Sequence, residues 1–500
     1  MHQEPSGAPR NGTGVPSMSP SPRTALAVLC AGALMAIVDE TVVAVSLPAI
    51  GADLGFSPAG LAWVTSAYLI AFAGLLLFAG RLGDLVGRRR VFLVGMAVFT
   101  SASVLCGLAW HPAVLVTARF VQGAGGAAMT AVILGIIVTL FDSPRPRAKA
   151  LGAFGFVQAS GGTLGMLVGG VVTELVSWHW VFFVNVPVGL VALVLAVRVV
   201  PDDRGAGLSA GMDLPGAALV TGALVAGIAT IVRIEEHGWA SGHTALGAAA
   251  SGLLLTAFAL RQSRARTPLL PARLLRSRIL AGANAVLLLL VASMFGFMFG
   301  TVLLLRTVLG FGARETGFAM VPAALAIALF SLSITPRAIT RFGERVVLTA
   351  GLVAVVGGLA ILARTPLSAD YPVHVLPALL LLGTGFGLAM PALMSWGMAE
   401  ATPADSGTVS GLFNTTQQVG GALGLSTMLV VAAARTRDLV ADGTPEPPAM
   451  LAGYRFGYLL AGGVVVAALL IALIVPGPRR VSGGASDTVP AGYRSEPPGP

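Results

Sequence analysis

The sequence predicts an all-α protein whose helices cross a membrane many times. Of its 500 residues, 55% are hydrophobic and 11% are charged, against about 25% charged in an ordinary soluble domain. The apolar residues occur in runs of about 18 to 28, and runs of that length span a bilayer. These observations exclude a string of soluble domains and indicate a polytopic membrane protein.

Fourteen apolar runs between polar connectors are predicted as membrane-spanning helices. In chain order they cover residues 25–48, 60–80, 91–110, 112–140, 149–173, 180–198, 214–232, 244–260, 279–304, 315–335, 346–363, 374–396, 408–433 and 455–476. The first run contains Asp39 and Glu40 and has no small-residue cleavage site, so we expect a retained span and not a signal peptide.

The spans divide into six helices, an inserted pair and six more. The pair 214–260 is followed by a connector, 261–278, that carries six arginines. The two ends of the chain are rich in Pro, Gly and Ser and poor in apolar residues, which is typical of disorder. The predicted units are a cytoplasmic tail over 1–23, a six-helix bundle over 24–200, the inserted pair with its linkers over 201–278, a six-helix bundle over 279–477 and a cytoplasmic tail over 478–500.

Basic residues predict the orientation, because cytoplasmic loops carry an excess of Lys and Arg. With the N-terminus inside, the cytoplasmic segments hold 23 basic residues and the outer segments hold seven. An even number of spans then places both termini in the cytoplasm. The net charge of +9 reflects these connectors, and no basic groove with interleaved aromatic residues predicts a nucleic-acid partner.

Charged residues inside the spans are candidate functional residues, because each costs about 2.5 to 3.5 kcal/mol at mid-membrane. Asp39 and Glu40 in the first span lie at the same depth as Arg119 in the fourth. A carboxylate beside an arginine can lose and regain a proton as the pair is broken and remade. We expect Asp39 to carry proton coupling, with Glu40, about 100° away around the helix, as the second candidate. The alternative is a static ion pair that only fixes helix packing.

Gln122 lies three positions after Arg119, on the same side of its helix. It is predicted to hydrogen-bond either a proton-relay water or the substrate. A purely structural polar contact is the equally weighted alternative.

The first cytoplasmic hairpin, residues 80–90, combines glycines with charged side chains. Gly80 and Gly87 allow a tight turn, and Asp84 can pair with an arginine or lie at the N-terminus of a neighbouring helix. Arg88 and Arg89 follow directly. This pattern is more specific than a cluster of basic residues at a membrane surface.

Glycines repeat in the fifth helix of each half. The first set is Gly161, Gly165 and Gly169, and the second is Gly407, Gly411, Gly420 and Gly424. Small residues four apart form a stripe on which another helix can pack closely. The correspondence supports an internal duplication, although glycine is frequent in a chain with 64 of them.

These motifs resemble the fourteen-span drug:proton antiporter branch of the major facilitator superfamily. Residues 80–90 look like the signature between its second and third helices, and Asp39–Pro48 resembles its first-helix motif. The further matches are Trp63 with Tyr68, residues 119–123, residues 178–187 and residues 410–418.

The resemblance implies two six-helix bundles that rock about a central cavity. It implies proton or substrate binding by Asp39, proton transfer by Arg119, and a cytoplasmic lock formed by Asp84 with Arg88. The implied antiporter motif of the fifth helix comprises Gly161, Gly165, Gly169 and Gly170, and the possible polar residues of the cavity are Tyr68, Asn414, Gln417 and Gln418.

Two positions depart from the family pattern. Met166 replaces the usual proline of the fifth helix, which removes a bend and affects the expected seal between the halves. Arg306 replaces a common glutamine near the outer mouth, where we expect it to disfavour cationic cargo. Deep acidic residues are missing from the second-half spans, which argues against divalent cargo.

The predicted function is therefore export of lipophilic drugs or antibiotics, driven by protons, in the cytoplasmic membrane. Export of a metabolite or siderophore made by the cell itself fits the sequence equally. A membrane-embedded enzyme is disfavoured, because the six histidines lie in tails, loops or helix ends and do not form a metal-binding pair within a span. A transport-dead sensor gives no reason for buried charges. We expect no cofactor, catalytic residue or metal site, and we expect the lipid bilayer and a small lipophilic substrate as the partners of a monomer.

Overall fold

The computed structural model describes residues 21–475, except 142, 204, 208–212, 239–240, 266–267, 400 and 403. Helices make up nearly all of this part of the chain, and no strand occurs in it. The predicted tail over 478–500, and residues 1–20 of the predicted tail over 1–23, lie outside the described residues.

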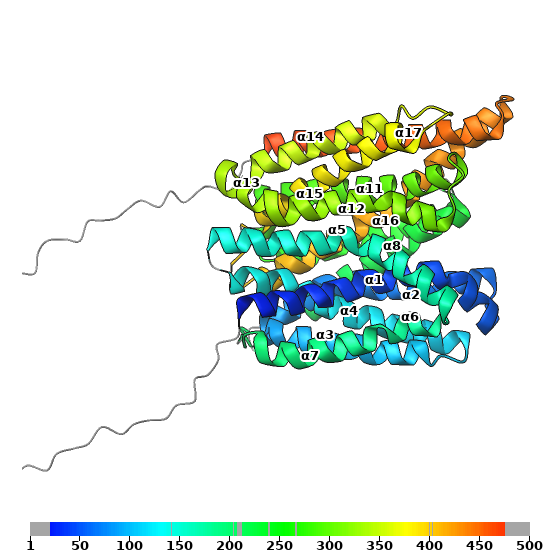
Figure 1. Ribbon diagram of the computed structural model, residues 1–500. Coiled ribbons are helices and arrows are strands. Elements are labelled where there is room, and N and C mark those ends of the chain that lie inside the picture. The colour runs from blue at the N-terminus through cyan, green and yellow to red at the C-terminus, as the bar shows by residue number, and fades with distance from the viewer. Residues whose placement is uncertain are drawn as a thin grey trace, which may run out of the picture.

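The first half of the chain forms one bundle of helices (Figure 1). Its elements are α1 (Pro22–Leu54), α2 (Pro58–Val86), α3 (Arg88–Gly107), α4 (Pro112–Leu140), α5 (Pro144–Leu175), α6 (His179–Phe183) and α7 (Asn185–Val199). A proline stands in the first turn of α1, α2, α4 and α5, where its missing N–H costs nothing.

The second half forms the other bundle. It follows the inserted helices α8 (Leu214–His237) and α9 (Gly242–Arg264) and the short connector helix α10 (Ala272–Arg276). Its elements are α11 (Arg278–Thr307), α12 (Ala313–Leu329), η2 (Phe330–Ile334), α13 (Thr335–Phe342), α14 (Glu344–Leu362), η3 (Tyr371–Val375), α15 (Leu376–Met398), α16 (Ser406–Ala441) and α17 (Glu446–Ile474).

The described helices form fourteen rods if α6 with α7, α12 with η2 and α13, and η3 with α15 each count as one and α10 is left out. Each rod overlaps one predicted span. By length and composition, 12 of the described helices are apolar enough to cross a membrane, and α8 adds a shorter apolar stretch, Pro215–Ile231. The prediction of an all-α, multiply membrane-spanning protein is confirmed.

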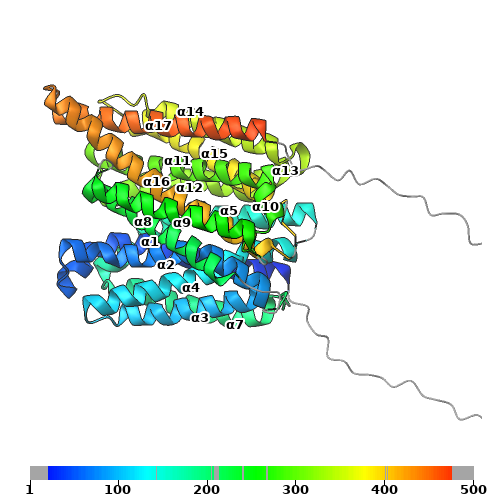
Figure 2. The same cartoon turned by 180° about the vertical axis from the view of Figure 1, so that it is seen from behind.

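The two bundles lie side by side, with the inserted pair across the seam between them (Figures 1 and 2). Helix α8 packs on α2 of the first bundle and on α16 of the second, and α9 packs on α8. Direct contacts between the bundles join α2 and α4 to α16, and α5 to α12, α13 and α15. The inserted helices therefore cover one side of the seam without separating its halves.

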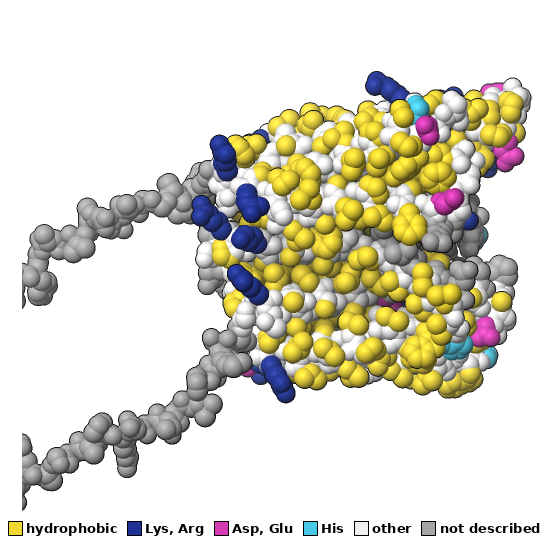
Figure 3. Space-filling view, viewed as in Figure 1, with side chains coloured by type: hydrophobic (Ala, Val, Ile, Leu, Met, Phe, Trp, Pro, Cys, Tyr) yellow, Lys and Arg dark blue, Asp and Glu magenta, His cyan; other side chains and the backbone are white. Residues whose placement is uncertain are grey.

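The start of α1 and the end of α17 lie at the same end of the molecule (Figure 1). Most of the Lys and Arg side chains visible in Figure 3 gather at that end, which we call the arginine-rich end. The outline is notched between the bundles at the opposite end (Figure 3). This distribution agrees with the predicted bias of basic residues, and an apolar band separates the two ends.

Several helices are longer than the apolar runs that predicted them. Residues 434–454 were expected to form an outer loop, but α16 continues to Ala441 and α17 starts at Glu446. Hydropathy ends a span at its first charges, here Arg435 and Arg437, whereas a helix continues into water when its residues favour helix. In Figure 1 the resulting helical hairpin projects beyond the bundle.

Candidate functional site

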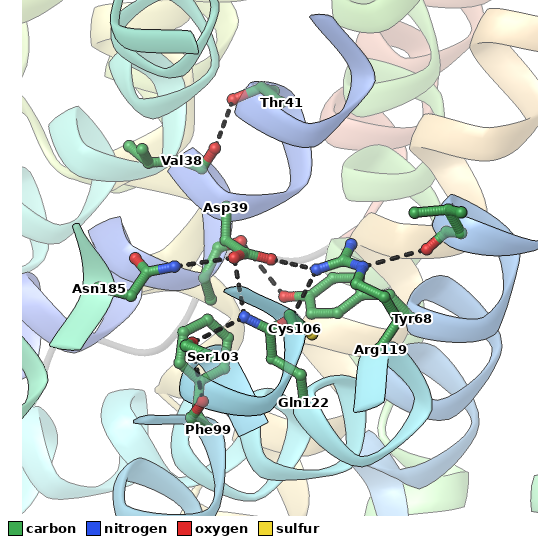
Figure 4. Close-up of polar contacts among 12 residues, drawn as sticks. Val38, Asp39, Thr41, Tyr68, Phe99, Ser103, Cys106, Arg119, Gln122 and Asn185 are labelled. Atoms are coloured by element: carbon green, nitrogen blue, oxygen red, sulfur yellow. Dashed lines mark hydrogen bonds and ion pairs between the residues drawn. The ribbon is translucent and has the colours of Figure 1, made fainter. Parts of the chain in front are cut away.

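Asp39 of α1 and Arg119 of α4 form a buried ion pair at the centre of a polar network in the first bundle (Figure 4). Arg119 Nη1 donates to Asp39 Oδ2 at 2.5 Å. The other carboxylate oxygen, Oδ1, accepts from Gln122 Nε2 and from Asn185 Nδ2, both at 2.8 Å. Gln122 also donates to Ser103 Oγ at 2.9 Å and accepts from Arg119 at 2.7 Å. Asp39 and Arg119, which were expected at the same depth, are thus in contact, and Gln122 makes a polar contact with both of them.

The remaining surroundings of Arg119 are a carbonyl and two aromatic rings. Its Nε donates to the Val64 carbonyl at 3.0 Å. Its guanidinium carbon lies 4.3 Å from the ring centroid of Tyr68 and 5.8 Å from that of Phe182, within the range of a cation–π interaction. Asp39 and Arg119 are 1% and 0% exposed. The charges are thus removed from water but fully partnered, as burial of charge requires.

Tyr68 was predicted as a possible polar residue of the central cavity, and the structure places it elsewhere. It is fully buried beneath Arg119, and its hydroxyl donates to the Ala36 carbonyl at 3.2 Å. Its ring stacks on Phe72. Tyr68 therefore supports the arginine from within the first bundle.

Glu40 faces away from this network, toward a cavity between the bundles. The cavity has a volume of about 40 Å³. It is lined by Ala33, Ala36, Ile37 and Glu40 of α1, Phe72 of α2, Thr130 of α4, Gln158 of α5, and Asn414, Gln417 and Gln418 of α16. The predicted divergence of the two carboxylates around α1 is confirmed, since one is enclosed in a bundle and the other lines the space between bundles.

Amide side chains bridge this cavity. Gln158 Nε2 of the first bundle donates to Gln417 Oε1 of the second at 2.9 Å. Asn414 Nδ2 donates to the Ser410 carbonyl at 2.9 Å and, across the seam, to the Thr130 carbonyl at 3.4 Å. Asn414, Gln417 and Gln418 thus lie where the resemblance implied, on the wall that the second bundle contributes.

Asp84 joins the two bundles at the arginine-rich end. Its Oδ1 accepts from the Gly407 backbone N–H and its Oδ2 from the Thr408 N–H, both at 2.8 Å. The Thr408 hydroxyl donates to Oδ2 at 2.7 Å, and Arg88 Nε donates to Oδ1 at 3.2 Å. Asp84 therefore lies at the N-terminus of α16, where a carboxylate is favoured, and also pairs with an arginine. Both predicted partners are present.

Close backbone packing accompanies this contact. A side chain at Gly80 would meet the Gly407 carbonyl, and one at Gly411 would meet the Leu76 carbonyl. The turn itself is formed by Gly87, whose φ of 103° suits glycine alone. Gly80 was expected in the turn, but it lies within α2, because the helix continues to Val86.

The start of α3 is held by the connector after α7. Asp203 accepts from the backbone N–H of Arg88 at 2.9 Å and from that of Arg89 at 3.1 Å. The Arg89 side chain donates to the Val197 carbonyl and pairs with Asp202 at 3.6 Å. Arg89 thus fixes the hairpin to its own bundle, whereas Asp84 reaches the other.

The glycine stripe of α5 packs against α1. Side chains at Gly161, Gly165 and Gly169 would meet Ile37, Thr41 and Val42 respectively. The fifth-helix motif was expected to contribute to the seal between the halves, but this stripe lies inside the first bundle. The seal is made nearer the arginine-rich end, where Gly152 approaches Ser331 and Gly155 approaches Pro391. Gly170 and Met166 lie in the same helix.

Sequence reasoning missed several side chains that contact the predicted residues, among them Ser103, Gln158, Asn185, Asp202, Asp203 and Thr408. Asn185 is the clearest case, because it lies in the motif over 178–187 and is 4% exposed. The sequence signal that could have found Asn185 is its position as a single amide side chain within an apolar run. The described residues contain no cluster of three or more His, Cys, Asp or Glu side chains that could hold a metal ion.

The structure thus has two helical bundles with a polar cavity on the seam between them. A buried ion pair lies beside the cavity, and a glycine-lined contact joins the bundles at one end. These features together are those of a membrane transporter. The sequence model of the Major Facilitator Superfamily matches residues 29–425. The chain belongs to this family.

The curated relatives resemble the chain over nearly its whole length. It is 38% identical over 492 residues to a cephamycin export protein of Amycolatopsis lactamdurans, covering 97% of this chain and 96% of the relative. It is 37% identical over 462 residues to a puromycin resistance protein of Streptomyces alboniger, covering 91% of each. A tetracenomycin C resistance and export protein of Streptomyces glaucescens is 31% identical, covering 99% of this chain and 90% of the relative.

Solved structures share the fold at lower identity. The proton:xylose symporter XylE matches with a TM-score of 0.64 and 14% identity, covering 91% of this chain and 96% of that one. The human organic anion transporter MFSD10 matches with a TM-score of 0.63 and 16% identity, covering 91% and 100%. These matches concern the arrangement of helices.

Proposed function

We propose that the protein is a proton-coupled antiporter that exports lipophilic drugs or antibiotics across the cytoplasmic membrane by alternating access. The observation that carries the proposal is the fully buried Asp39–Arg119 pair beside a cavity on the seam between two bundles. Relatives named for resistance to or export of antibiotics support the cargo class. Proton re-entry supplies about 2.3 kcal/mol per charge per 100 mV.

The described conformation is closed at the arginine-rich end. Asp84 with Gly407, and Gly152 with Ser331, hold the bundles together there. The excess of basic residues favours this end, with both termini, as the cytoplasmic one. The protein is then closed to the cytoplasm, and the cavity of about 40 Å³ is far below the roughly 300 to 1,000 Å³ of ligand sites. Cargo therefore enters only after the bundles tilt apart.

Asp39 is the proposed proton-coupling residue. Its partners Arg119 and Asn185 come from α4 and α7, so the carboxylate ties α1 to two other helices. A proton on Asp39 removes the charge that holds Arg119 and weakens this tie. Movement of α1 then changes the cavity wall, because Glu40, Ile37 and Ala36 belong to the same helix.

The proposal includes no cofactor and no enzymatic activity. Protons are the coupling ion, and the lipid bilayer and one lipophilic cargo molecule are the partners of a monomer. The proposal includes no nucleic-acid partner.

A second candidate function is export of a compound that the producing cell makes itself. The names of the cephamycin export protein and of a probable actinorhodin transporter of Streptomyces coelicolor, 33% identical over 414 residues, favour it. Deletion of the gene in its own host would then reduce secretion of an endogenous product, whereas a drug exporter would change only susceptibility to added compounds.

A susceptibility screen tests the main proposal. A pump-deficient bacterial host expressing the chain is exposed to puromycin, cephamycin and other lipophilic antibiotics. We expect resistance to at least one of them, lower cellular accumulation, and loss of both effects when a protonophore is added. Unchanged susceptibility and accumulation for every compound, at verified expression, would contradict the proposal.

A further inference from the structure

Glu40 is a carboxylate within the apolar stretch Pro22–Val43 of α1, without a hydrogen-bond or ion-pair partner of its own in the described part of the chain. Among the described residues, neither an ion pair nor a hydrogen bond to its side chain occurs, although it lines the seam cavity. Its neighbour Asp39 has three donors. Because an unpaired charge in hydrocarbon costs several kcal/mol, Glu40 indicates a missing cationic partner.

Two other polar atoms of the cavity wall also lack partners. Thr130 Oγ1 and Gln418 Nε2 are buried and are without a hydrogen-bond partner in the described part of the chain. Thr130 is 4% exposed. Buried polar groups are nearly always hydrogen-bonded, so two such atoms beside an unpaired carboxylate point to a ligand that is polar at one end.

The size and lining of the cavity suit a small cationic head. A volume of about 40 Å³ is enough for an ammonium group, given that one water needs about 10 to 15 Å³ on this measure. Phe72, Ile37 and Ala33 supply apolar wall, and an aromatic face attracts a cation. The described lining residues include no Lys, Arg or His.

We propose that Glu40, Thr130 and Gln418 form the recognition site for cargo that carries a single protonated amine. Glu40 pairs with the ammonium group, the Thr130 hydroxyl accepts a second N–H, and the Gln418 amide donates to an oxygen near the amine. The apolar body of the cargo occupies the space that opens when the bundles separate. This inference rests on the proposed export function and specifies its substrate class.

The charge balance favours one positive charge and not two. Asp39 and Arg119 neutralise each other within the first bundle, so Glu40 is left as the one acidic group lining the cavity. Arg306, which we expected to disfavour cations, is exposed in the last turn of α11 and is not among the lining residues. Its position does not oppose a cation at Glu40.

A binding experiment tests the inference without requiring transport. The purified full-length protein is titrated with monodansylcadaverine, a fluorescent lipophilic amine, and with its N-acetyl derivative, which keeps the body and loses the charge. A charge-assisted hydrogen bond contributes about 1.5 to 3 kcal/mol, so we expect the amine to bind at least about ten-fold more tightly. In Glu40→Gln the two probes should bind alike.

Matched variants exclude indirect effects. Glu40→Asp keeps the charge and should keep part of the preference, whereas Glu446→Gln removes an exposed acid at the start of α17 and should leave it unchanged. Equal binding of the two probes by the wild type, or a preference that survives in folded Glu40→Gln, would overturn the inference. Transport failure in the presence of this binding preference would instead count against the antiport proposal alone.

Discussion

Asp39 and Glu40 are consecutive in α1, yet their carboxylates lie in different environments. Asp39 accepts hydrogen bonds from three side chains inside the first bundle, whereas Glu40 lines the cavity between the bundles. Helix α1 therefore separates the ion pair enclosed in the first bundle from the cavity between the bundles. A rotation or tilt of α1 would move both carboxylates together.

The ion pair of Asp39 and Arg119 can be tested for a role beyond packing. Arg119→Gln alone leaves a buried carboxylate unpaired, and we expect destabilisation of about 3 to 5 kcal/mol. The double variant Asp39→Asn/Arg119→Gln removes both charges and should recover most of the thermal stability. We expect it to remain inactive in drug efflux, because the carboxylate proposed to take up the proton is gone.

A purely static ion pair gives the opposite result for that double variant. Recovery of both stability and proton-driven efflux would show that the pair only fixes helix packing. Melting temperature and efflux are measured on the same preparations.

The contact of Asp84 with α16 should control how long the arginine-rich end stays closed. Asp84→Asn loses the charge that faces the Gly407 and Thr408 N–H groups, at a cost of about 1 to 2 kcal/mol. A change of that size shifts a two-state equilibrium by about 5 to 30-fold. The expected result is faster thiol labelling at Ser410→Cys, a buried position of α16, in a background with Cys30 and Cys106 replaced by alanine.

The wild-type Asp84 protein with the same reporter cysteine is the reference for that experiment. An unchanged labelling rate in folded Asp84→Asn would mean that the contact does not hold the closed state.

The glycine stripe of α5 should tolerate no added side chain at its centre. A Cβ at Gly165 would meet the Thr41 hydroxyl and the Val38 carbonyl of α1. We expect Gly165→Val to lower stability by about 1 to 3 kcal/mol or more and to reduce folded yield in detergent. Gly252→Ala in α9, where a Cβ meets nothing within 4 Å, is the matched control and should keep the melting temperature. Equal melting temperatures for the two variants would contradict the packing argument.

Topology is tested by thiol labelling of intact cells in the same cysteine-free background. Ser263→Cys lies exposed near the end of α9, and Gly443→Cys lies in the exposed turn between α16 and α17. With both termini in the cytoplasm, an impermeant maleimide should label only the second. Labelling of Ser263→Cys from outside would reverse the proposed orientation.

Most of the fold could be predicted because hydropathy reports spans directly. The fourth span was predicted as 112–140, the bounds of α4 (Pro112–Leu140), since Pro112 starts that helix and the apolar run ends with it. The predicted outer loop over 434–454 was wrong, because α16 continues to Ala441 and α17 already starts at Glu446. Charged residues end a membrane span without ending the helix. Hydropathy likewise ended the second span at Gly80, although α2 continues to Val86.

The site was predictable only in part. Asp39, Glu40 and Arg119 could be predicted as functional residues because a charged side chain inside a membrane span costs free energy. The geometry of the helix predicted that the two carboxylates face different directions. The partners Asn185 and Thr408 could not be found this way, because their roles depend on which helices meet. The cavity needs both bundles in place, so the unpartnered atoms of Thr130 and Gln418 are visible only in three dimensions.

The most direct test of the central claim is substrate-induced proton movement in inverted membrane vesicles with an acidic interior. On addition of a compound to which the chain confers resistance, wild-type vesicles should release protons from the lumen, read as recovery of a quenched pH dye. Asp39→Asn, expressed and folded at the same level, should show no recovery, whereas Glu446→Gln should match the wild type. Full recovery in Asp39→Asn would contradict the account.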